Sequence, residues 1–423
     1  MSLSEFSTAR THWAGLPLAE LAKQFGTPLY VYDPAIIAAR VADLRAFDVI
    51  RYAQKACGNI AILDRVRQQG VKVDAVSAGE IQRAIAAGYS VHPGSRDIVY
   101  TADIFDHAAL DLVLKHHLHV NCGSPDMISQ IGQRRPGSDV TLRINPGFGH
   151  GHSQKTNTGG QQSKHGIWFE QIDECLRLAD QTGVTVTGLH MHIGSGTDLE
   201  HLGQVCQSME QAALTVGRTI QTISAGGGLP VPYRPSESFV DLGKYFELWD
   251  TMRQKLVAAF GHPVELEIEP GRYLSAEAGL MLAEVRAVKK MGDNTFVLLD
   301  AGFNDMARSA MYGAYHPISV VAGDGSDAGR RESIDVVVGG PLCESGDIFT
   351  QTEGGFVESR SLPVPRIGDY LAIENAGAYG FVMASNYNSK TRAAEVMIED
   401  GVAKEIRQRE TTEDLIRGEI IPA

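Results

Sequence analysis

The sequence predicts an α/β fold, a parallel (β/α)8 barrel of the TIM type followed by a mainly β domain. The first observation is an alternation of short apolar runs with longer stretches of helical periodicity, repeated eight times before about residue 282. The second is a change of rhythm after Ala283, where short strand-like runs are joined by connections rich in Gly and Pro.

The barrel prediction rests on eight strand-like runs with amphipathic stretches between them. In the stretch Ile60–Gln69, for example, Ile62, Leu63 and Val66 share one helical face. An open doubly wound sheet is the structural alternative. No Gly-x-Gly-x-x-Gly follows the first strand, which weakens a dinucleotide-binding reading. The expected strands are Val49–Ala53, Val71–Ser77, Ile98–Thr101, His119–Asn121, Thr141–Asn145, Gly188–Ile193, Thr222–Ala225 and Val264–Ile268.

The C-terminal part reads as a separate β domain. An apolar run at Leu29–Tyr32 precedes the first barrel strand, and no clear helical pattern lies before it. We expect an N-terminal segment, 1–32, packed with the β domain, then a barrel over 33–282 and a β domain over 283–423. The expected β-domain strands are Val285–Val288, Thr295–Leu299, Ile334–Val338, Tyr370–Glu374, Glu395–Ile398 and Ala403–Arg407.

Composition narrows the class of protein. The formal net charge of −13 over 423 residues argues against nucleic acid and anionic membranes, which reward clustered Lys and Arg. Five cysteines, an odd number without a Cys-x-x-Cys, indicate a reduced protein without a disulfide framework. The start lacks a signal-peptide pattern, and no apolar run approaches the ~18 residues of a spanning helix. We therefore expect a cytoplasmic protein.

Four features, in order along the chain, supply the parts needed to hold pyridoxal phosphate (PLP). They are Lys55, His192, the run Gly226–Gly228 and the tetrapeptide Glu269–Arg272. Lys55 ends the first strand, where burial in the barrel mouth would favour the neutral amine that a Schiff base needs. On its own, a lysine at a strand end is more often a solvent-exposed side chain. The histidine, glycine and Glu–Arg motifs downstream favour a cofactor-binding lysine instead.

The glycine run and the tetrapeptide follow the last two barrel strands, where barrel phosphate sites gather. Three glycines expose backbone N–H groups and suit a phosphate, although they also suit a tight turn. Glu269 would keep a pyridine nitrogen protonated, which deepens the electron sink. Arg272 could hold a phosphate or a substrate carboxylate. An internal ion pair between the two is the structural alternative.

Three histidine pairs raise the question of a metal. His190 and His192 share one strand face, and further histidine pairs occur at 116–117 and 150–152. Carboxylate and cysteine partners of a typical site are not nearby in sequence, so we expect no metal. A ring stacked on a flat cofactor is the better use for one histidine of the first pair.

Two loops carry further candidates. Gly147–Gly166 follows a barrel strand and is long and polar, which favours a lid over a solvated surface loop. Cys343, Glu344 and Asp347 follow a buried-looking strand. They form either a packed turn or an acid–base site, and the sequence alone does not separate the two.

Short motifs over nearly the whole chain resemble the diaminopimelate decarboxylase family, PLP-dependent enzymes of the alanine-racemase-like fold. One departure is Arg308-Ser309-Ala310, where the family pattern is Arg-Pro-Ala. No reacting group is removed by it. The matching segments are Tyr52–Ala56, Val73–Ser77, Gly79–Glu80, Gly188–Ser195, Gly226–Gly228, Glu269–Arg272, Asp300–Asp305, Tyr315–Pro317, Gly340–Asp347, Gly377–Gly380 and Ser385–Ser389.

The resemblance implies roles for individual residues. Lys55 would form the Schiff base, His192 would stack on the ring and Cys343 would donate a proton. Cys343 and Glu344 would reach the site from the other subunit of a homodimer. The implied cofactor contacts are Lys55, Asp74, His192, Ser195, Gly227, Gly228, Glu269, Gly271, Arg272 and Tyr379, and the implied substrate contacts are Arg272, Arg308, Tyr312, Glu344 and Tyr379.

The implied reaction converts meso-2,6-diaminopimelate to L-lysine and carbon dioxide, the last step of lysine biosynthesis. Decarboxylation of ornithine, arginine or carboxynorspermidine is the nearest rival, but the arginines favour a substrate with a second carboxylate. A racemase would need a second acid–base group opposite Lys55. A PLP carrier without catalysis would need only the barrel, so the segment from Ala283 to Ala423 argues against it. A sugar-binding module is the remaining alternative, and colour distinguishes the two, because a protein with bound PLP is yellow and a sugar-binding module is not.

Overall fold

The computed structural model describes residues 6–149, 158–194 and 199–422. These residues divide into two compact units. One unit holds the barrel, residues 38–230 and 239–273, and the other is mainly β, residues 1–37, 231–238 and 274–423. The functional candidates are spread over both, so each unit is described in turn.

The barrel unit confirms the predicted (β/α)8 architecture, including all eight strands. Each strand is parallel to its neighbours, and the sheet closes because β12 pairs with β4 and β8 pairs with β10. This closure excludes the open doubly wound sheet. The strands are β4 (Val49–Ala53), β5 (Lys72–Ala75), β6 (Ile98–Ala102), β7 (His119–Cys122), β8 (Asp139–Asn145), β10 (Thr185–His190), β11 (Thr222–Ser224) and β12 (Glu265–Ile268), with the short β9 (Ile167–Trp168) beside β8.

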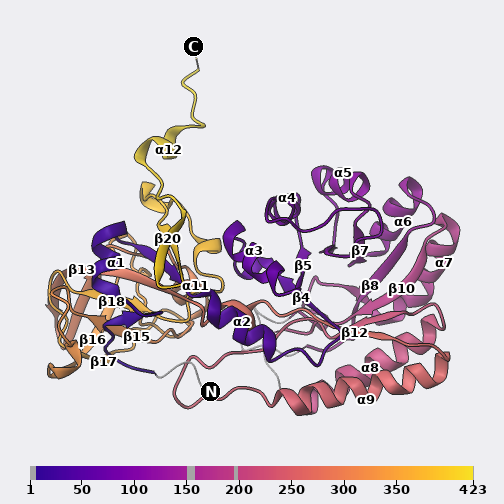
Figure 1. Ribbon diagram of the computed structural model, residues 1–423, viewed down its shortest axis with the longest axis horizontal. Coiled ribbons are helices and arrows are strands. Elements are labelled where there is room, and N and C mark those ends of the chain that lie inside the picture. Colours follow the sequence, from indigo (N-terminus) through magenta and orange to yellow (C-terminus); the bar gives the residue numbers. More distant parts are fainter. Residues whose placement is uncertain (1–5, 150–157, 195–198, 423) are drawn as a thin grey trace. The chain divides into compact units, whose positions relative to one another are not determined.

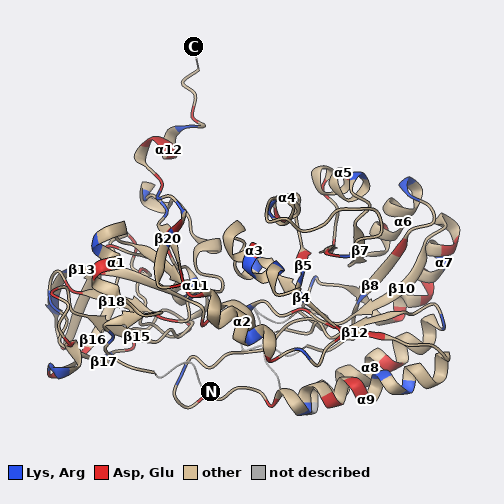
Figure 2. Ribbon diagram, in the orientation of Figure 1, with Lys and Arg blue, Asp and Glu red and all other residues tan. Residues whose placement is uncertain are grey.

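Helices surround the barrel strands (Figure 1). Side chains at helix starts accept backbone N–H groups that have no partner within the helix, as Asn59, Ser77 and Asp106 do. Acidic and basic residues are interspersed along the outer helix α9 (Figure 2). The helices are α3 (Ile60–Gln68), α4 (Ala78–Ala86), α5 (His107–Lys115), α6 (Pro125–Arg134), α7 (Ile172–Thr182), α8 (Leu199–Val216) and α9 (Leu242–Phe260), while α2 (Pro34–Ala42) and α10 (Arg272–Ser275) lie where the chain passes between units.

The long strand β13 (Gly279–Met291) organises the β unit. It pairs antiparallel with β3 (Leu29–Tyr32), β14 (Asn294–Leu299) and β18 (Tyr370–Ile373). A core of buried Leu, Val, Ile and Ala side chains packs α1 (Leu18–Phe25) against β3, β13 and β18. The remaining elements are β1 (His12–Trp13), β2 (Leu16–Pro17), α11 (Arg308–Tyr312), β15 (Ile318–Val321), β16 (Ser333–Gly339), β17 (Arg360–Pro363), β19 (Ala394–Glu399), β20 (Val402–Arg407) and α12 (Thr412–Ile416).

The structure adds elements that the sequence patterns did not predict. Helix α1 is one, because its apolar face covers only two turns, with Leu18, Leu21 and Ala22 buried. Strands β15 and β17 are two further examples, each only four residues long. All six predicted β-domain strands are present.

The units also divide the chain at other residues than those predicted. The observed breaks fall at 37/38, 230/231, 238/239 and 273/274, whereas the predicted domain boundaries are 32/33 and 282/283. The difference arises because β13 begins at Gly279 and pairs with β3 from that residue on. Among the described residues, no helix is long and apolar enough to cross a membrane.

Candidate active site

The barrel's first strand leads directly to Lys55. β4 passes into a short 3-10 helix, Gln54–Ala56, in which Gln54 and Ala56 are buried and Lys55 is exposed. The expected burial of the lysine amine is therefore wrong for this chain, because Lys55 lies on the helix turn and not within the strand. Asp74 and Glu80 both lie near enough to interact electrostatically with Lys55.

Asp74 is a buried carboxyl at the end of β5. Burial and repulsion from Glu269 raise its pKa to about 7, against the opposing effects of Thr101 and Lys55. Its Oδ1 atom is buried without a hydrogen-bond partner among the described residues. Burial also raises the pKa of Glu80, whose Oε2 accepts the backbone N–H of Val76 at 2.8 Å.

Glu269 follows β12 and is held by two neighbouring strands. His190 Nε2 lies 2.8 Å from its Oε2, and Ser224 Oγ donates to its Oε1 at 3.0 Å. His190 and Ser224 are register partners in β10 and β11, so the two contacts come from one level of the barrel. Burial alone would raise the pKa of Glu269, but His190, Arg51 and Ser224 lower it to about 2. Glu269 is thus a buried and ionised carboxylate.

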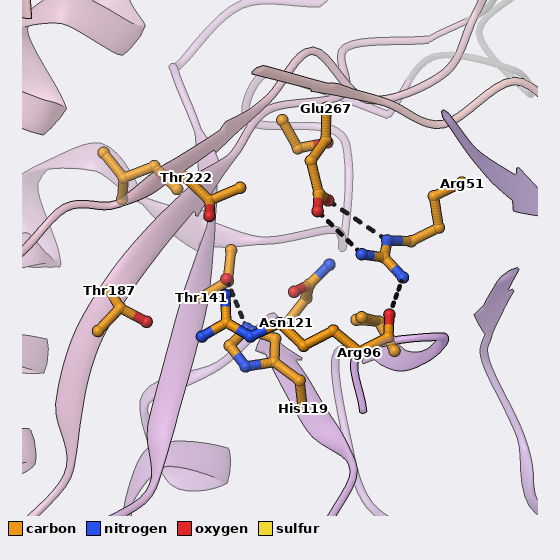
Figure 3. A pocket seen from close by; sticks show the side chains of 11 residues that line it. Arg51, Arg96, His119, Asn121, Thr141, Thr187, Thr222 and Glu267 are labelled. Atoms are coloured by element: carbon orange, nitrogen blue, oxygen red, sulfur yellow. Dashed lines mark hydrogen bonds and ion pairs between the residues drawn. The ribbon is translucent and has the colours of Figure 1, made fainter. Parts of the chain in front are cut away.

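Within the barrel, a polar layer continues from Ser224 to a buried ion pair (Figure 3). The guanidinium of Arg51 donates to both oxygens of Glu267, at 2.9 and 3.3 Å, and to the carbonyl of Arg96 at 2.9 Å. Figure 3 shows the other polar side chains of this pocket, among them His119 against Thr141. A buried pair with its hydrogen bonds satisfied fixes the charges near Glu269.

The predicted glycine run forms a close-packed turn after β11. Gly226 and Gly228 have φ of 63° and 100°, which side chains rarely adopt. A Cβ on Gly228 would lie 2.3 Å from the carbonyl oxygen of Gly194, and one on Gly227 would lie 2.6 Å from that of Glu269. The turn therefore needs glycine. The N–H of Gly226 donates to Ser224 Oγ at 3.2 Å, and a glycine turn of this kind suits a phosphate.

His192 lies beside this turn. Its Cε1 atom is 3.7 Å from where a Cβ of Gly227 would stand. Burial, with Arg143 and Lys55, holds the pKa of His192 well below its usual value, so the imidazole is neutral. Its Nδ1 atom is buried without a partner among the described residues. A flat, neutral ring in this position can lie on the face of a cofactor.

The tetrapeptide after β12 is hydrogen-bonded to the end of β4, the strand that precedes Lys55. Ala53 donates its N–H to the carbonyl of Pro270 at 3.1 Å. A Cβ on Gly271 would meet Ala53 and Ala56 at 3.2 Å, so Gly271 permits the close approach. Arg272 begins α10 and is half-buried.

Part of the predicted lid and Ser195 lie outside the described residues. The described ends of the loop Gly147–Gly166 are fastened to the barrel. Asn145 Oδ1 accepts the N–H groups of Gly147 and Gly160, and Thr158 Oγ1 donates to the carbonyl of His192 at 2.9 Å. The lid function stays a prediction.

In the β unit, Cys343 and Glu344 are exposed on a turn that Asp347 shapes. The Asp347 carboxylate accepts the backbone N–H groups of Phe303 at 2.7 Å and Leu342 at 2.8 Å. The N–H of Cys343 donates to Asn388 Oδ1 at 2.7 Å. Asp347 therefore builds the turn, while Cys343 is presented to solvent.

Arg308 and Tyr312 stand one helical turn apart on α11 and face the same way. Arg308 is buried, and Tyr312 is half-buried. Tyr379 has a φ of 57°, an uncommon conformation for a residue other than glycine. Such residues gather at functional sites.

The structure brings Lys55, Asp74, His192, the glycine turn and Glu269 into one unit, and places Cys343, Glu344, Arg308, Tyr312 and Tyr379 in the other. Sequence reasoning missed Ser224 as a partner of Glu269. The signal available was a polar residue facing into the barrel two positions before the glycine run. Among the described residues, no group of three or more His, Cys, Asp or Glu is placed to hold a metal.

The barrel site fits PLP on its own geometry. It offers an ionised carboxylate for the pyridine nitrogen, a glycine turn for the phosphate, a neutral ring for stacking and a lysine amine. Residues 37–276 match the family "Pyridoxal-dependent decarboxylase, pyridoxal binding domain". The fold and site together define a PLP-dependent decarboxylase.

Known proteins place the chain more closely. Diaminopimelate decarboxylase of Escherichia coli strain K12 is 52% identical over 404 residues, 96% of each chain. A crystal structure of diaminopimelate decarboxylase matches with a TM-score of 0.92 and 52% identity over 95% of each chain. The Helicobacter pylori diaminopimelate decarboxylase complexed with L-lysine matches with a TM-score of 0.80 and 31% identity, over 94% of this chain and 98% of that one. This chain belongs to the diaminopimelate decarboxylase family.

Proposed function

We propose that the protein decarboxylates meso-2,6-diaminopimelate to L-lysine and carbon dioxide, the last step of lysine biosynthesis, in the cytoplasm. The observation that carries the chemistry is the buried, ionised Glu269, held by His190 and Ser224 beside the glycine turn. The substrate is proposed from the close similarity to diaminopimelate decarboxylases.

Bound PLP supplies an electron sink for the charge left on the substrate carbon when carbon dioxide departs. The residues of the barrel prepare that sink. Lys55 provides the amine that anchors the cofactor, and Gly227, Gly228, Gly271 and Arg272 bind its phosphate side. Glu269 would keep the ring nitrogen protonated, with Asp74 close to Glu269. His192 would cover one face of the ring.

The β unit supplies the selectivity in this proposal. The substrate keeps a second carboxylate after reaction, and a guanidinium is the side chain best suited to bind it in two-point fashion. Arg308 takes this role with Tyr312 and Tyr379, and Glu344 receives the neighbouring ammonium group. Ornithine has no second carboxylate, so it would leave Arg308 without its partner.

Cys343 protonates the substrate carbon, and it does so from a second copy of the chain. Its exposure on a turn fixed by Asp347 supports this role, because the thiol is presented outward while the backbone beneath it is anchored. A homodimer with shared active sites follows. Glu344 is exposed on the same turn and would enter the same site.

Product analysis tests the proposal. The purified, PLP-loaded protein is given meso-diaminopimelate, the L,L isomer and L-ornithine in parallel. Lysine from the meso isomer alone is the expected result. Putrescine from ornithine without lysine would keep the fold and the cofactor and overturn the assignment of the substrate.

A further inference from the structure

We propose that His316 is the positioning residue that holds Arg308 ready for the substrate's second carboxylate, and that it acts as a neutral imidazole with its proton on Nδ1. The proposal rests on the proposed function, in which Arg308 binds that carboxylate. His316 belongs to the motif Tyr315–Pro317, for which no role is named in the sequence analysis above.

The two contacts of the His316 ring fix its proton. Nδ1 lies 2.9 Å from the backbone carbonyl oxygen of Glu374, and Nε2 lies 2.8 Å from Arg308 Nη1. A carbonyl oxygen only accepts, so Nδ1 carries the proton. A guanidinium only donates, so Nε2 offers its lone pair. A second proton on His316 would place an imidazolium cation against the Arg308 cation. Because His316 is only 3% exposed, solvent would do little to weaken the repulsion between the two.

Tyr233 closes the other side of the guanidinium. Its hydroxyl accepts from the same Nη1 atom at 3.2 Å, and its ring stands edge-on to His316 at 5.3 Å between centroids. The guanidinium carbon of Arg308 lies 5.2 Å from the centre of the Tyr233 ring. The two hydrogens of Nη1 are thus directed at His316 and Tyr233. These two bonds orient the guanidinium, whose planar edge has the geometry to bind a carboxylate bidentately.

His316 stands on a rigid support. The backbone carbonyl of Glu374 accepts the hydrogen bond from His316 Nδ1. The carboxylate of Glu374 accepts two hydrogen bonds from Arg10, at 2.5 and 2.9 Å. Ser319 donates to the same carboxylate. The next residue, Asn375, has a φ of 54° and donates its side-chain amide to the carbonyl of Pro232 at 2.9 Å. One short segment therefore fixes both His316 and the chain that bears Tyr233.

This arrangement predicts an effect confined to ligands that carry the carboxylate. L-Lysine retains it, whereas 1,5-diaminopentane is the same molecule without it. Replacing His316 releases Arg308 from its orientation and weakens only the first of the two ligands. A residue needed merely for folding would weaken both.

The test measures dissociation constants of L-lysine and 1,5-diaminopentane on the PLP-loaded enzyme by calorimetry. His316→Leu is expected to weaken L-lysine about tenfold or more, the loss of one hydrogen bond to a charged group, and to change 1,5-diaminopentane less than about twofold. His316→Gln keeps an acceptor near the Nε2 position and is expected to recover most of the affinity. Thr350→Val is the matched control, because it removes a buried hydroxyl of the β unit that accepts the N–H of Val338 and belongs to no contact of His316, Glu374 or Arg308 described above.

Equal weakening of both ligands, or no weakening of either, would overturn the proposal. If His316→Leu does not fold, His316→Asn replaces it. Asparagine keeps the donor toward Glu374 but is too short to reach Arg308, so it is expected to lose L-lysine affinity. A wild-type enzyme that does not prefer L-lysine to 1,5-diaminopentane would instead overturn the proposed role of Arg308. A wild type that does prefer it, with a His316→Leu variant that keeps the preference, would overturn the role of His316 alone.

Discussion

His190 Nε2 lies 2.8 Å from Glu269 Oε2 inside the barrel, with both side chains buried. Ser224, on the neighbouring strand, donates a hydrogen bond to the other carboxylate oxygen of Glu269. The carboxylate that would face the cofactor is thus oriented by the protein's own side chains. Preorganised charge of this kind supplies much of the rate enhancement in enzymes.

Replacing His190 should raise the pKa of Glu269, because a hydrogen bond and a favourable interaction with the ionised form are lost. For His190→Phe we expect kcat to fall roughly ten- to a hundredfold, by analogy with the loss of one preorganised partner. The acid limb of the kcat–pH profile should move to higher pH. His119→Phe is the matched control, since His119 is a second histidine inside the barrel whose ring contacts Thr141 and not Glu269. Identical profiles for the two variants would contradict the account.

The glycine turn should not tolerate a methyl group. Gly228→Ala places a Cβ 2.3 Å from the carbonyl of Gly194 at a φ of 100°. We expect PLP affinity to fall at least about tenfold, because the N–H groups that hold the phosphate move. Equilibrium dialysis of PLP gives the measurement. Gly203→Ala, in α8 with nothing within 4 Å of its Cβ, should bind PLP normally and gain about 0.5–1 kcal/mol of stability. Normal PLP binding by the Gly228 variant would argue against the phosphate role.

Asp74 should make the cofactor-free protein less stable as the pH rises. Its folded-state pKa of about 7 lies above the usual 3.8, so between these values the folded state holds a proton that the unfolded state has released. Stability therefore falls as the pH rises from about 4 through 7. Asp74→Asn removes this cost and should stabilise the cofactor-free protein at pH 8 by roughly 1–3 kcal/mol, with no gain near pH 4. Urea unfolding at the two pH values measures the difference. A gain of equal size at both would show that charge is not the cause.

The shared active site can be tested by mixing inactive variants. Lys55→Ala removes the barrel lysine, and Cys343→Ala removes the thiol from the β unit. If each site takes Lys55 from one subunit and Cys343 from the other, a mixed dimer has one intact site. Random reassociation should then restore about a quarter of the wild-type activity. No recovery after mixing, with mixed dimers shown by mass spectrometry, would place both groups in a single chain.

The fold was largely predictable from the sequence, because a closed parallel barrel repeats one pattern, a buried strand and then an amphipathic helix. Short elements such as β15 and β17 were not, since four residues carry no periodicity. Lys55 and Glu269 could be identified from their places at strand ends. Two hydrogen bonds could not be predicted, that of Ser224 with Glu269 and that of Arg308 with His316. Each depends on how separate segments of the chain pack together.

The exposure of Lys55 was also beyond sequence reasoning. A strand continued by two more residues, to Lys55, would have directed the side chain into the barrel, but the chain turns into a 3-10 helix at Gln54. Asp74 and Glu80 remain close enough to interact with it. The amine therefore lies beside two carboxyl groups whose pKa values are raised.

The most direct test of the central claim is to locate the attached cofactor. The PLP-loaded protein is reduced with borohydride, digested and mapped by mass spectrometry. The account predicts a pyridoxyl adduct on the peptide that contains Lys55, and none in the Lys55→Ala variant. An adduct on a different lysine, or a protein that retains no cofactor, would contradict it.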